Sequence, residues 1–190
     1  MKIMHYHLGF PPMRSGGLTK YAVDLMEAEQ QLGHDVYALI PGNFKYFSKE
    51  SRIVEDKTWN TIRVFKITNA LPIPFAFGIK KPSRFIERKN VDGLLELLFT
   101  IKPDVLHVHT LMGLPIEVLQ LFKEHHVRIV MTTHDYFGLC PRVNFINYKG
   151  EFCDKATPEK CALCCKNSKG LWYLKLRNSP LLLIFKKLFR

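Results

Sequence analysis

Residues 2–42 read KIMHYHLGFPPMRSGGLTKYAVDLMEAEQQLGHDVYALIPG, and their pattern predicts a strand, a glycine-bearing loop, a helix and a second strand. The first strand covers residues 2–8 and ends at Gly9. Gly33 is a typical signal for the end of the helix. Such a unit predicts a right-handed βαβ connection in a parallel sheet. The apolar face expected for the helix comprises Leu18, Tyr21, Ala22, Leu25, Ala28 and Leu32.

The rest of the chain continues the alternation of short strands and amphipathic helices. A chain of 190 residues with 47% hydrophobic residues is long enough for one well-formed α/β core. The run VRIVM at 127–131 reads as a buried strand. We therefore expect an α/β fold, built on a Rossmann-like, doubly wound parallel sheet with helices on both faces. Further strands are expected at 61–67, 104–110 and 127–135, and further helices at 90–101 and 114–126.

Residues suited to ligand binding gather where the predicted strands end, which is where such sheets bind their ligands. Gly16 and Gly17 follow the first strand, and free N–H groups at the start of the next helix can bind a phosphate. A glycine pair also often serves only to turn the chain. His107 and His109 alternate along one strand, so they share one sheet face. One of them is expected to pack in the core and the other to line the crevice.

His134 and Asp135 come at the end of the last predicted strand. An imidazole at this position can bind a sugar hydroxyl or a phosphate, and it titrates near neutral pH. Asp135 can either orient His134 or cap the next segment. These two residues are therefore the candidate catalytic pair.

Five cysteines follow the His-Asp pair, in an expected cysteine-rich loop over residues 136–165. Cys140, Cys153, Cys161 and Cys164 are separated by twelve, seven and two residues, and the last two form a CxxC knuckle. Structural disulfides are not expected in a reducing cytosol. Four thiolates in a segment with few apolar residues suit a structural zinc ion. Reduced thiols without a metal are the alternative.

The net charge of +11 is concentrated near one end, because residues 166–190 contain seven Lys or Arg and no acidic residue. Mixed with Leu, Phe, Trp and Tyr, these charges favour a basic amphipathic helix on an anionic membrane surface or a helix docked on a protein domain. A nucleic-acid binder is not favoured, since no RRM, KH or helix-turn-helix pattern occurs. No apolar run of transmembrane length and no signal-peptide pattern is found. A cytoplasmic location, with peripheral membrane contact as an option, is expected.

Three segments, GGLTKYAVDLMEAEQQLGHDVYALIPG, KPDVLHVHTLMGLP and TTHDYFGLCPRVNFINYKGEFCD, occur in this order, and KCALCC follows them. Together they resemble the N-terminal domain of family 4 glycosyltransferases, which have the GT-B fold. They resemble in particular the branch with a cysteine-bearing insertion after the His-Asp pair. The resemblance covers residues 1–165. It implies a retaining hexosyl-type transferase that uses a nucleotide-sugar donor and a glycan or lipid-linked acceptor, with no cofactor for catalysis.

The resemblance also implies roles for individual residues. Gly16 and Gly17 would approach the donor diphosphate, and His134 would face the donor sugar. Any zinc at the cysteines would be structural. The acceptor side would be lined by His107, His109 and Arg142.

Family 4 enzymes have a second Rossmann-like domain that carries most of the donor site, and nothing in these 190 residues resembles it. We therefore expect an acceptor-side domain at 1–165, a basic helical tail at 166–190, and no donor-binding domain. Such a chain should transfer little sugar alone, because both halves of the cleft stabilise the leaving diphosphate. A non-enzymatic zinc-binding interaction module is the alternative function.

Overall fold

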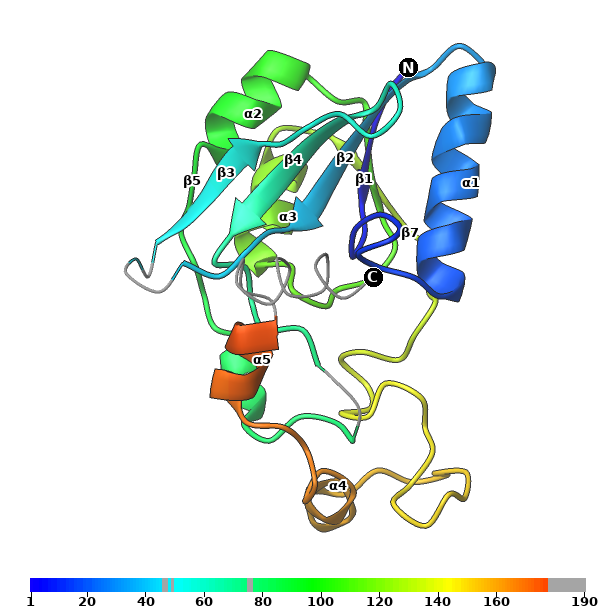
Figure 1. Cartoon of the computed structure of the whole chain (residues 1–190), viewed down its shortest axis with the longest axis vertical. Coiled ribbons are helices and arrows are strands. Elements are labelled where there is room, and N and C mark those ends of the chain that lie inside the picture. The colour runs from blue at the N-terminus through cyan, green and yellow to red at the C-terminus, as the bar shows by residue number, and fades with distance from the viewer. Residues whose placement is uncertain (46–47, 49, 75–76, 178–190) are drawn as a thin grey trace.

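The structure, a computed structural model, describes residues 1–45, 48, 50–74 and 77–177. Within these residues, seven strands form one sheet in the order β5-β3-β4-β2-β1-β6-β7, with helices on both faces (Figure 1). The predicted α/β, Rossmann-like fold is confirmed. The strands are β1 (Lys2–Tyr6), β2 (Asp35–Pro41), β3 (Ser51–Glu55), β4 (Arg63–Thr68), β5 (Val91–Asp92), β6 (Val105–Val108) and β7 (Arg128–Met131). The helices are α1 (Gly17–Gln31), α2 (Leu94–Ile101), α3 (Ile116–Glu124), α4 (Pro158–Cys164) and α5 (Leu171–Arg177), with one 3-10 turn at Pro82–Phe85.

The predicted βαβ unit is present, because β1 pairs in parallel with β2 and α1 connects them. The face that α1 buries is different from the expected one. Tyr21 and Leu32 were expected inside and are 45% and 75% exposed. Both candidate faces repeat with helical spacing, so only packing against the sheet distinguishes them. The buried residues of α1 are Thr19, Ala22, Val23 and Met26.

The sheet is mostly parallel rather than wholly parallel as expected. Strands β4, β2, β1, β6 and β7 are parallel neighbours, whereas β3 runs antiparallel to β4. The expected helix at 90–101 is shorter, because β5 occupies its first residues and pairs with β3. Gly93 then precedes α2 with a left-handed φ of 75°.

The strand VRIVM is an exposed edge, not the buried strand that its composition predicts. β7 pairs only with β6 among the described strands. The side chains of Ile129, Val130 and Met131 are between 36% and 45% exposed. An apolar run identifies a strand, but its burial depends on which segments cover it in three dimensions.

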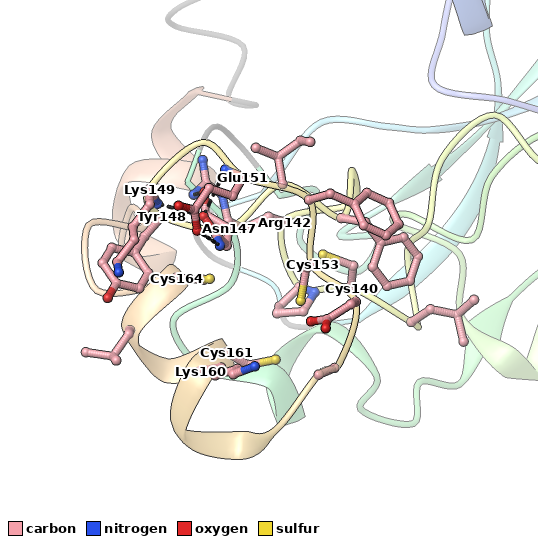
Figure 2. A pocket seen from close by; sticks show the side chains of 18 residues that line it. Cys140, Arg142, Asn147, Tyr148, Lys149, Glu151, Cys153, Lys160, Cys161 and Cys164 are labelled. Atoms are coloured by element: carbon pink, nitrogen blue, oxygen red, sulfur yellow. Dashed lines mark hydrogen bonds between the residues drawn. The ribbon is translucent and has the colours of Figure 1, made fainter.

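Residues 136–165 form a loop-rich lobe away from the sheet, and it contains only α4 as regular helix (Figures 1 and 2). The helix α5 follows this lobe and packs on the domain through Leu174, which is 2% exposed and lies in a small cluster with Ile79 and Phe85. For residues 171–177 this contact favours the docked-helix alternative. Residues 178–190 of the predicted tail lie outside the described residues. Among the helices that are described, none is long and apolar enough to cross a membrane.

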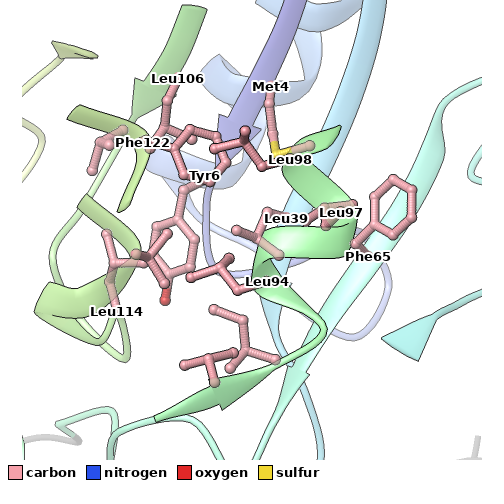
Figure 3. Packing of buried hydrophobic residues seen from close by; sticks show 14 of the residues in the cluster. Met4, Tyr6, Leu39, Phe65, Leu94, Leu97, Leu98, Leu106, Leu114 and Phe122 are labelled. Atoms are coloured by element: carbon pink, nitrogen blue, oxygen red, sulfur yellow. The ribbon is translucent and has the colours of Figure 1, made fainter. Parts of the chain in front are cut away.

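Two apolar layers hold the sheet in place. One layer lies between the sheet and helices α2 and α3, and it includes Met4, Tyr6, Leu97 and Phe122 (Figure 3). The other lies between the sheet and α1. Burying each large apolar side chain contributes about 1.5–3 kcal/mol. The strand ends that carry the candidate residues are therefore fixed on a well-packed base.

Candidate functional site

His134 lies beyond the carboxyl end of β7, against the N-terminal part of α1. Its ring centroid is 4.8 Å from that of Tyr21, in an edge-to-face arrangement. Tyr21 lies one helical turn after Gly17, so His134 and the glycine loop meet at the same side of the sheet. Two candidates more than a hundred residues apart in the sequence are thus brought close, as the crevice rule predicts.

The loop before α1 requires a glycine at one of its two glycine positions. Gly16 is the N-cap of α1 with φ 119° and ψ 173°, a backbone region that is essentially restricted to glycine. Gly17 opens the helix with no such restriction, and a Cβ added at either glycine would meet nothing within 4 Å. The first turn of α1 has no acidic residue and no side-chain cap, and the first N–H groups of a helix have no partner within the helix.

Asp135 acts as an anchor for the chain in this structure. Its Oδ2 accepts a hydrogen bond of 2.8 Å from the Thr110 hydroxyl, and its Oδ1 accepts one of 2.8 Å from the backbone N–H of Phe137. Both carboxylate oxygens are therefore engaged away from His134. This geometry favours the capping alternative over the orienting one.

His107 lies on β6 and His109 directly follows this strand, and both are buried instead of one lining the crevice. His109 is 0% exposed and His107 is 9% exposed. The Nε2 of His107 lies 2.8 Å from the Thr132 hydroxyl. Burial, followed by repulsion from neighbouring histidines, lowers the pKa of His109 to about 2 and also lowers the pKa of His107. Both rings are therefore neutral at physiological pH.

His5 on β1 joins these two histidines and completes a buried cluster. Its Nδ1 lies 3.0 Å from Nε2 of His109, and its Nε2 lies 2.6 Å from a carboxylate oxygen of Glu29. On the outer side, Nδ1 of His109 lies 3.3 Å from Nε2 of His134. The cluster thus connects the helix α1 to the crevice.

The cluster has metal-ligand geometry, but its nitrogens are already used. Within the described part of the chain, His5, His107 and His109 are the only group of three or more potential ligands whose ligand atoms all lie within 4.8 Å. Both ring nitrogens of His5 and of His109 have hydrogen-bond partners. A metal ion would have to replace these bonds, so the geometry favours a hydrogen-bonded network.

Sequence reasoning missed Glu29 and His5. The periodicity gave no signal for Glu29, because Glu29 lies on the face of α1 that only the structure shows to be buried, three residues after Met26. A carboxylate on a buried helix face requires a partner. His5 occupies an inward position of β1, where an imidazole likewise needs a partner.

Two adjoining cavities lie beside the glycine loop, of about 500 Å³ and about 290 Å³. Arg14 and Ser15 line both of them. The larger also contains Lys57, Lys66 and Asp56, and Lys66 is paired with Asp56. Its lining still carries more positive than negative charge, which favours an anionic ligand. Arg142 lines the smaller one, so the structure brings Arg142 to the glycine loop. His134 lines neither cavity.

The lobe surrounds a third cavity, of about 450 Å³ (Figure 2). Its lining includes all four proposed metal ligands, Cys140, Cys153, Cys161 and Cys164. Cys165 is buried and packs near Gly78 instead, where an added Cβ would lie 2.6 Å from its sulfur.

Four thiols are a suitable ligand set for a metal ion, but their sulfur atoms do not have the spacing of a metal site. Burial and the neighbouring thiols raise the pKa of Cys161. A divalent cation among the sulfurs would reverse this repulsion. Among the described residues, the four thiols are not a group whose ligand atoms lie close enough together to hold a metal ion, so binding requires the lobe to close around the ion.

The model of one protein family, Glycosyltransferase Family 4, matches residues 15–158. The match includes the glycine loop, the histidines and most of the cysteine lobe. No curated protein and no solved structure gives a significant match to the chain. Because the family model covers well over half of the sequence, and the α/β sheet places the glycine loop and His134 at one side, the chain belongs to Glycosyltransferase Family 4.

Proposed function

We propose that this chain is the acceptor-side half of a GT-B enzyme that transfers a hexosyl-type sugar, with retention, from a nucleotide-sugar to a glycan or lipid-linked acceptor. The observation that carries the proposal is the meeting of His134 with the N-terminal part of α1 in a chain of this family. The start of α1, which has no side-chain cap and no acidic residue in its first turn, suits a diphosphate, and the imidazole of His134 suits a sugar hydroxyl.

Gly16 and Gly17 would let the donor diphosphate approach the backbone, and His134 would contact the donor sugar. Arg142 would act on the acceptor side from the smaller cavity beside Ser15. His107 and His109 are too buried to touch an acceptor directly, so their influence would pass through His134. Most of the donor site would be supplied by a second Rossmann-like domain of the family.

The proposed location of the protein is the cytoplasm, with peripheral contact to an anionic membrane that would carry a lipid-linked acceptor. The basic residues of 166–190 support this part of the proposal. Co-sedimentation with phosphatidylglycerol vesicles, with and without residues 178–190, tests it. Equal binding by the two forms would count against a tail anchor.

The transfer reaction is tested by supplying the chain with a donor-binding domain and measuring radiolabelled sugar transfer from uridine- and guanosine-diphosphate sugars. We expect His134→Ala to reduce turnover by about 10²-fold or more, the range for a group acting on the reacting centre. His125→Ala, on an exposed residue at the end of α3, is the matched control and should transfer normally. The 190-residue chain alone should show little transfer. Unchanged turnover in His134→Ala would refute the role given to this residue.

A structural zinc ion in the lobe is a second proposal, carried by the four cysteines that line one cavity. Zinc would be held by Cys140, Cys153, Cys161 and Cys164 and would supply no chemistry to the reaction. As the alternative function, a zinc-braced lobe could serve as an interaction module without any transferase role.

Elemental analysis of reduced protein tests the zinc proposal. We expect one zinc ion per chain, lost in Cys161→Ser. The matched control is Cys165→Ser, because Cys165 does not line the cavity and its loss should leave the zinc content unchanged. Metal-free protein from cells grown with zinc would reject the proposal and leave the transferase proposal untouched.

A further inference from the structure

Four side chains form an unbroken line of hydrogen bonds from α1 to His134, beyond the carboxyl end of β7. They are Glu29, His5, His109 and His134, and the three successive atom pairs are separated by 2.6, 3.0 and 3.3 Å. His5 and His109 are completely buried, whereas the side chain of Glu29 is 16% exposed. The line therefore connects a nearly buried carboxylate to a histidine at the site.

The carboxylate gives this line a direction. An ionised carboxylate only accepts hydrogen bonds, so Nε2 of His5 must carry its proton toward Glu29. In neutral His5, Nδ1 is then unprotonated and accepts a hydrogen bond from Nε2–H of His109. The Nδ1 of neutral His109 is likewise unprotonated and accepts a hydrogen bond from Nε2–H of His134. This leaves Nδ1 of His134 as a hydrogen-bond acceptor.

We propose that Glu29, His5 and His109 form a proton relay for His134. The relay keeps Nδ1 of His134 unprotonated, and when this nitrogen takes up a proton, the relay carries a proton inward to His5. The proton source is a hydroxyl group of a bound ligand, or water. When Nδ1 of His134 gains this proton, its Nε2 proton passes to Nδ1 of His109. The Nε2 proton of His109 passes to Nδ1 of His5. His134 and His109 end neutral with reversed tautomers, and His5 becomes an imidazolium paired with the carboxylate.

The surroundings favour a charge on His5 over one on His109. His109 has no carboxylate partner, and burial holds its pKa at about 2. His5 has the Glu29 carboxylate at 2.6 Å. The other titratable rings near the relay are His107, stacked on His109 at 4.3 Å between centroids, and His7, a buried residue just after β1. Burial lowers the pKa of both, so they stay neutral and do not compete for the proton.

His107 and the aromatic ring of Tyr21 isolate the relay without entering it. His107 bonds to the Thr132 hydroxyl, outside the line. Tyr21 covers His134 and His109 edge-on, with ring centroids at 4.8 and 5.9 Å. Of the three histidines in the line, His134 is the one that is not fully buried, so a ligand can reach the line there. Glu29, His5 and His109 are positioning residues, since they act on such a ligand only through His134.

The relay predicts a signature that an isolated histidine cannot give. Histidine tautomers are read from two-bond proton–nitrogen correlations of the ¹⁵N-histidine-labelled chain, recorded as the pH is lowered. We expect His134 to change from the Nε2–H to the Nδ1–H tautomer while remaining singly protonated, together with a second proton on His5. A His134 that becomes doubly protonated while His5 does not would overturn the proposal. No substrate is needed, so the result is independent of the proposed transferase function.

Variants of the carboxylate sharpen the experiment. In Glu29→Leu the line loses its acceptor, and a second proton should stay on His134 instead of reaching His5. Glu29→Gln retains a carbonyl acceptor without the charge, so the Nε2–H tautomer of His134 should survive while the transfer to His5 weakens. The matched control is Glu27→Leu, whose carboxylate contacts Asn60 at the surface and should leave the spectra unchanged. Wild-type behaviour in Glu29→Leu, with thermal melts confirming a folded protein, would also refute the relay.

Discussion

The buried histidines His5, His107 and His109 and the cysteine lobe at 136–165 are held in different ways. His5, His107 and His109 are fixed on adjacent strands, above an apolar layer that contains fully buried side chains such as Tyr6 and Phe122. The lobe at 136–165 has little of its own to bury. Its large apolar side chains Leu139, Phe152 and Leu163 are between 53% and 74% exposed. A site that must hold atoms in place is built on the sheet, whereas a segment without a core needs another brace, such as a metal ion.

The largest effect should distinguish the two regions by a matched pair of phenylalanines. Phe122 of α3 is 0% exposed in the core, and Phe122→Ala should lower the free energy of unfolding by about 3–5 kcal/mol. Phe152 in the lobe is 74% exposed, and Phe152→Ala should change it by less than about 0.5 kcal/mol. Urea denaturation measures both. A comparable loss in Phe152→Ala would show that the lobe packs against something that its exposure does not reveal.

The second effect concerns the glycine loop at the sheet edge. Gly16→Ala places a side chain in a backbone region reserved for glycine and should cost about 1–3 kcal/mol. Gly17→Ala meets neither strain nor contact and should leave stability nearly unchanged. Thermal melts of the two variants compare them directly. If Gly17→Ala nevertheless abolishes sugar transfer, the close approach of a donor at this position is supported.

The smallest of the three effects is the pH dependence that the buried histidines impose. Burial lowers the pKa of His7 to about 3 and that of His109 to about 2, whereas the same groups titrate near 6.5 in the unfolded chain. Below about pH 6.5 these histidines are therefore protonated in the unfolded state but not in the folded state. Each such histidine should lower the unfolding free energy by about 1.4 kcal/mol per pH unit as the pH falls, and its contribution is fully present above pH 6.5.

Denaturation curves at several pH values, with a His7→Phe variant, check this slope. His7 packs edge-on against Phe10 in the core, so an aromatic replacement preserves the shape of the site. In this variant the slope of the unfolding free energy against pH should fall by the amount that corresponds to about one bound proton. The exposed residue His125 provides the control, because His125→Gln should leave the slope as it is. A lobe-borne pH effect, from cysteines instead of histidines, would appear at alkaline pH.

Local patterns in the sequence were sufficient for the order of elements and for the first βαβ unit. Helical and strand periodicities are set by backbone geometry, so the pattern over residues 2–42 could be interpreted without knowing what surrounds it. The convergence of His134 with the glycine loop also followed from topology, since parallel strands end at one side of the sheet. The same reasoning placed all four cysteines in one loop.

Tertiary packing alone decided what each face touches. The sequence could not show that α1 turns Glu29 inward, that His5 lies beside it, or that VRIVM forms an exposed edge. These features depend on which strands are neighbours and on a rotation of the helix by one residue. The hydrophobic periodicity of the sequence does not determine either of them. The sequence by itself therefore determined the fold class and the residues at the sheet edge. Only the structure determined how His5, His109 and Glu29 connect to His134, because hydrogen bonds between distant segments exist only once the sheet has brought them together.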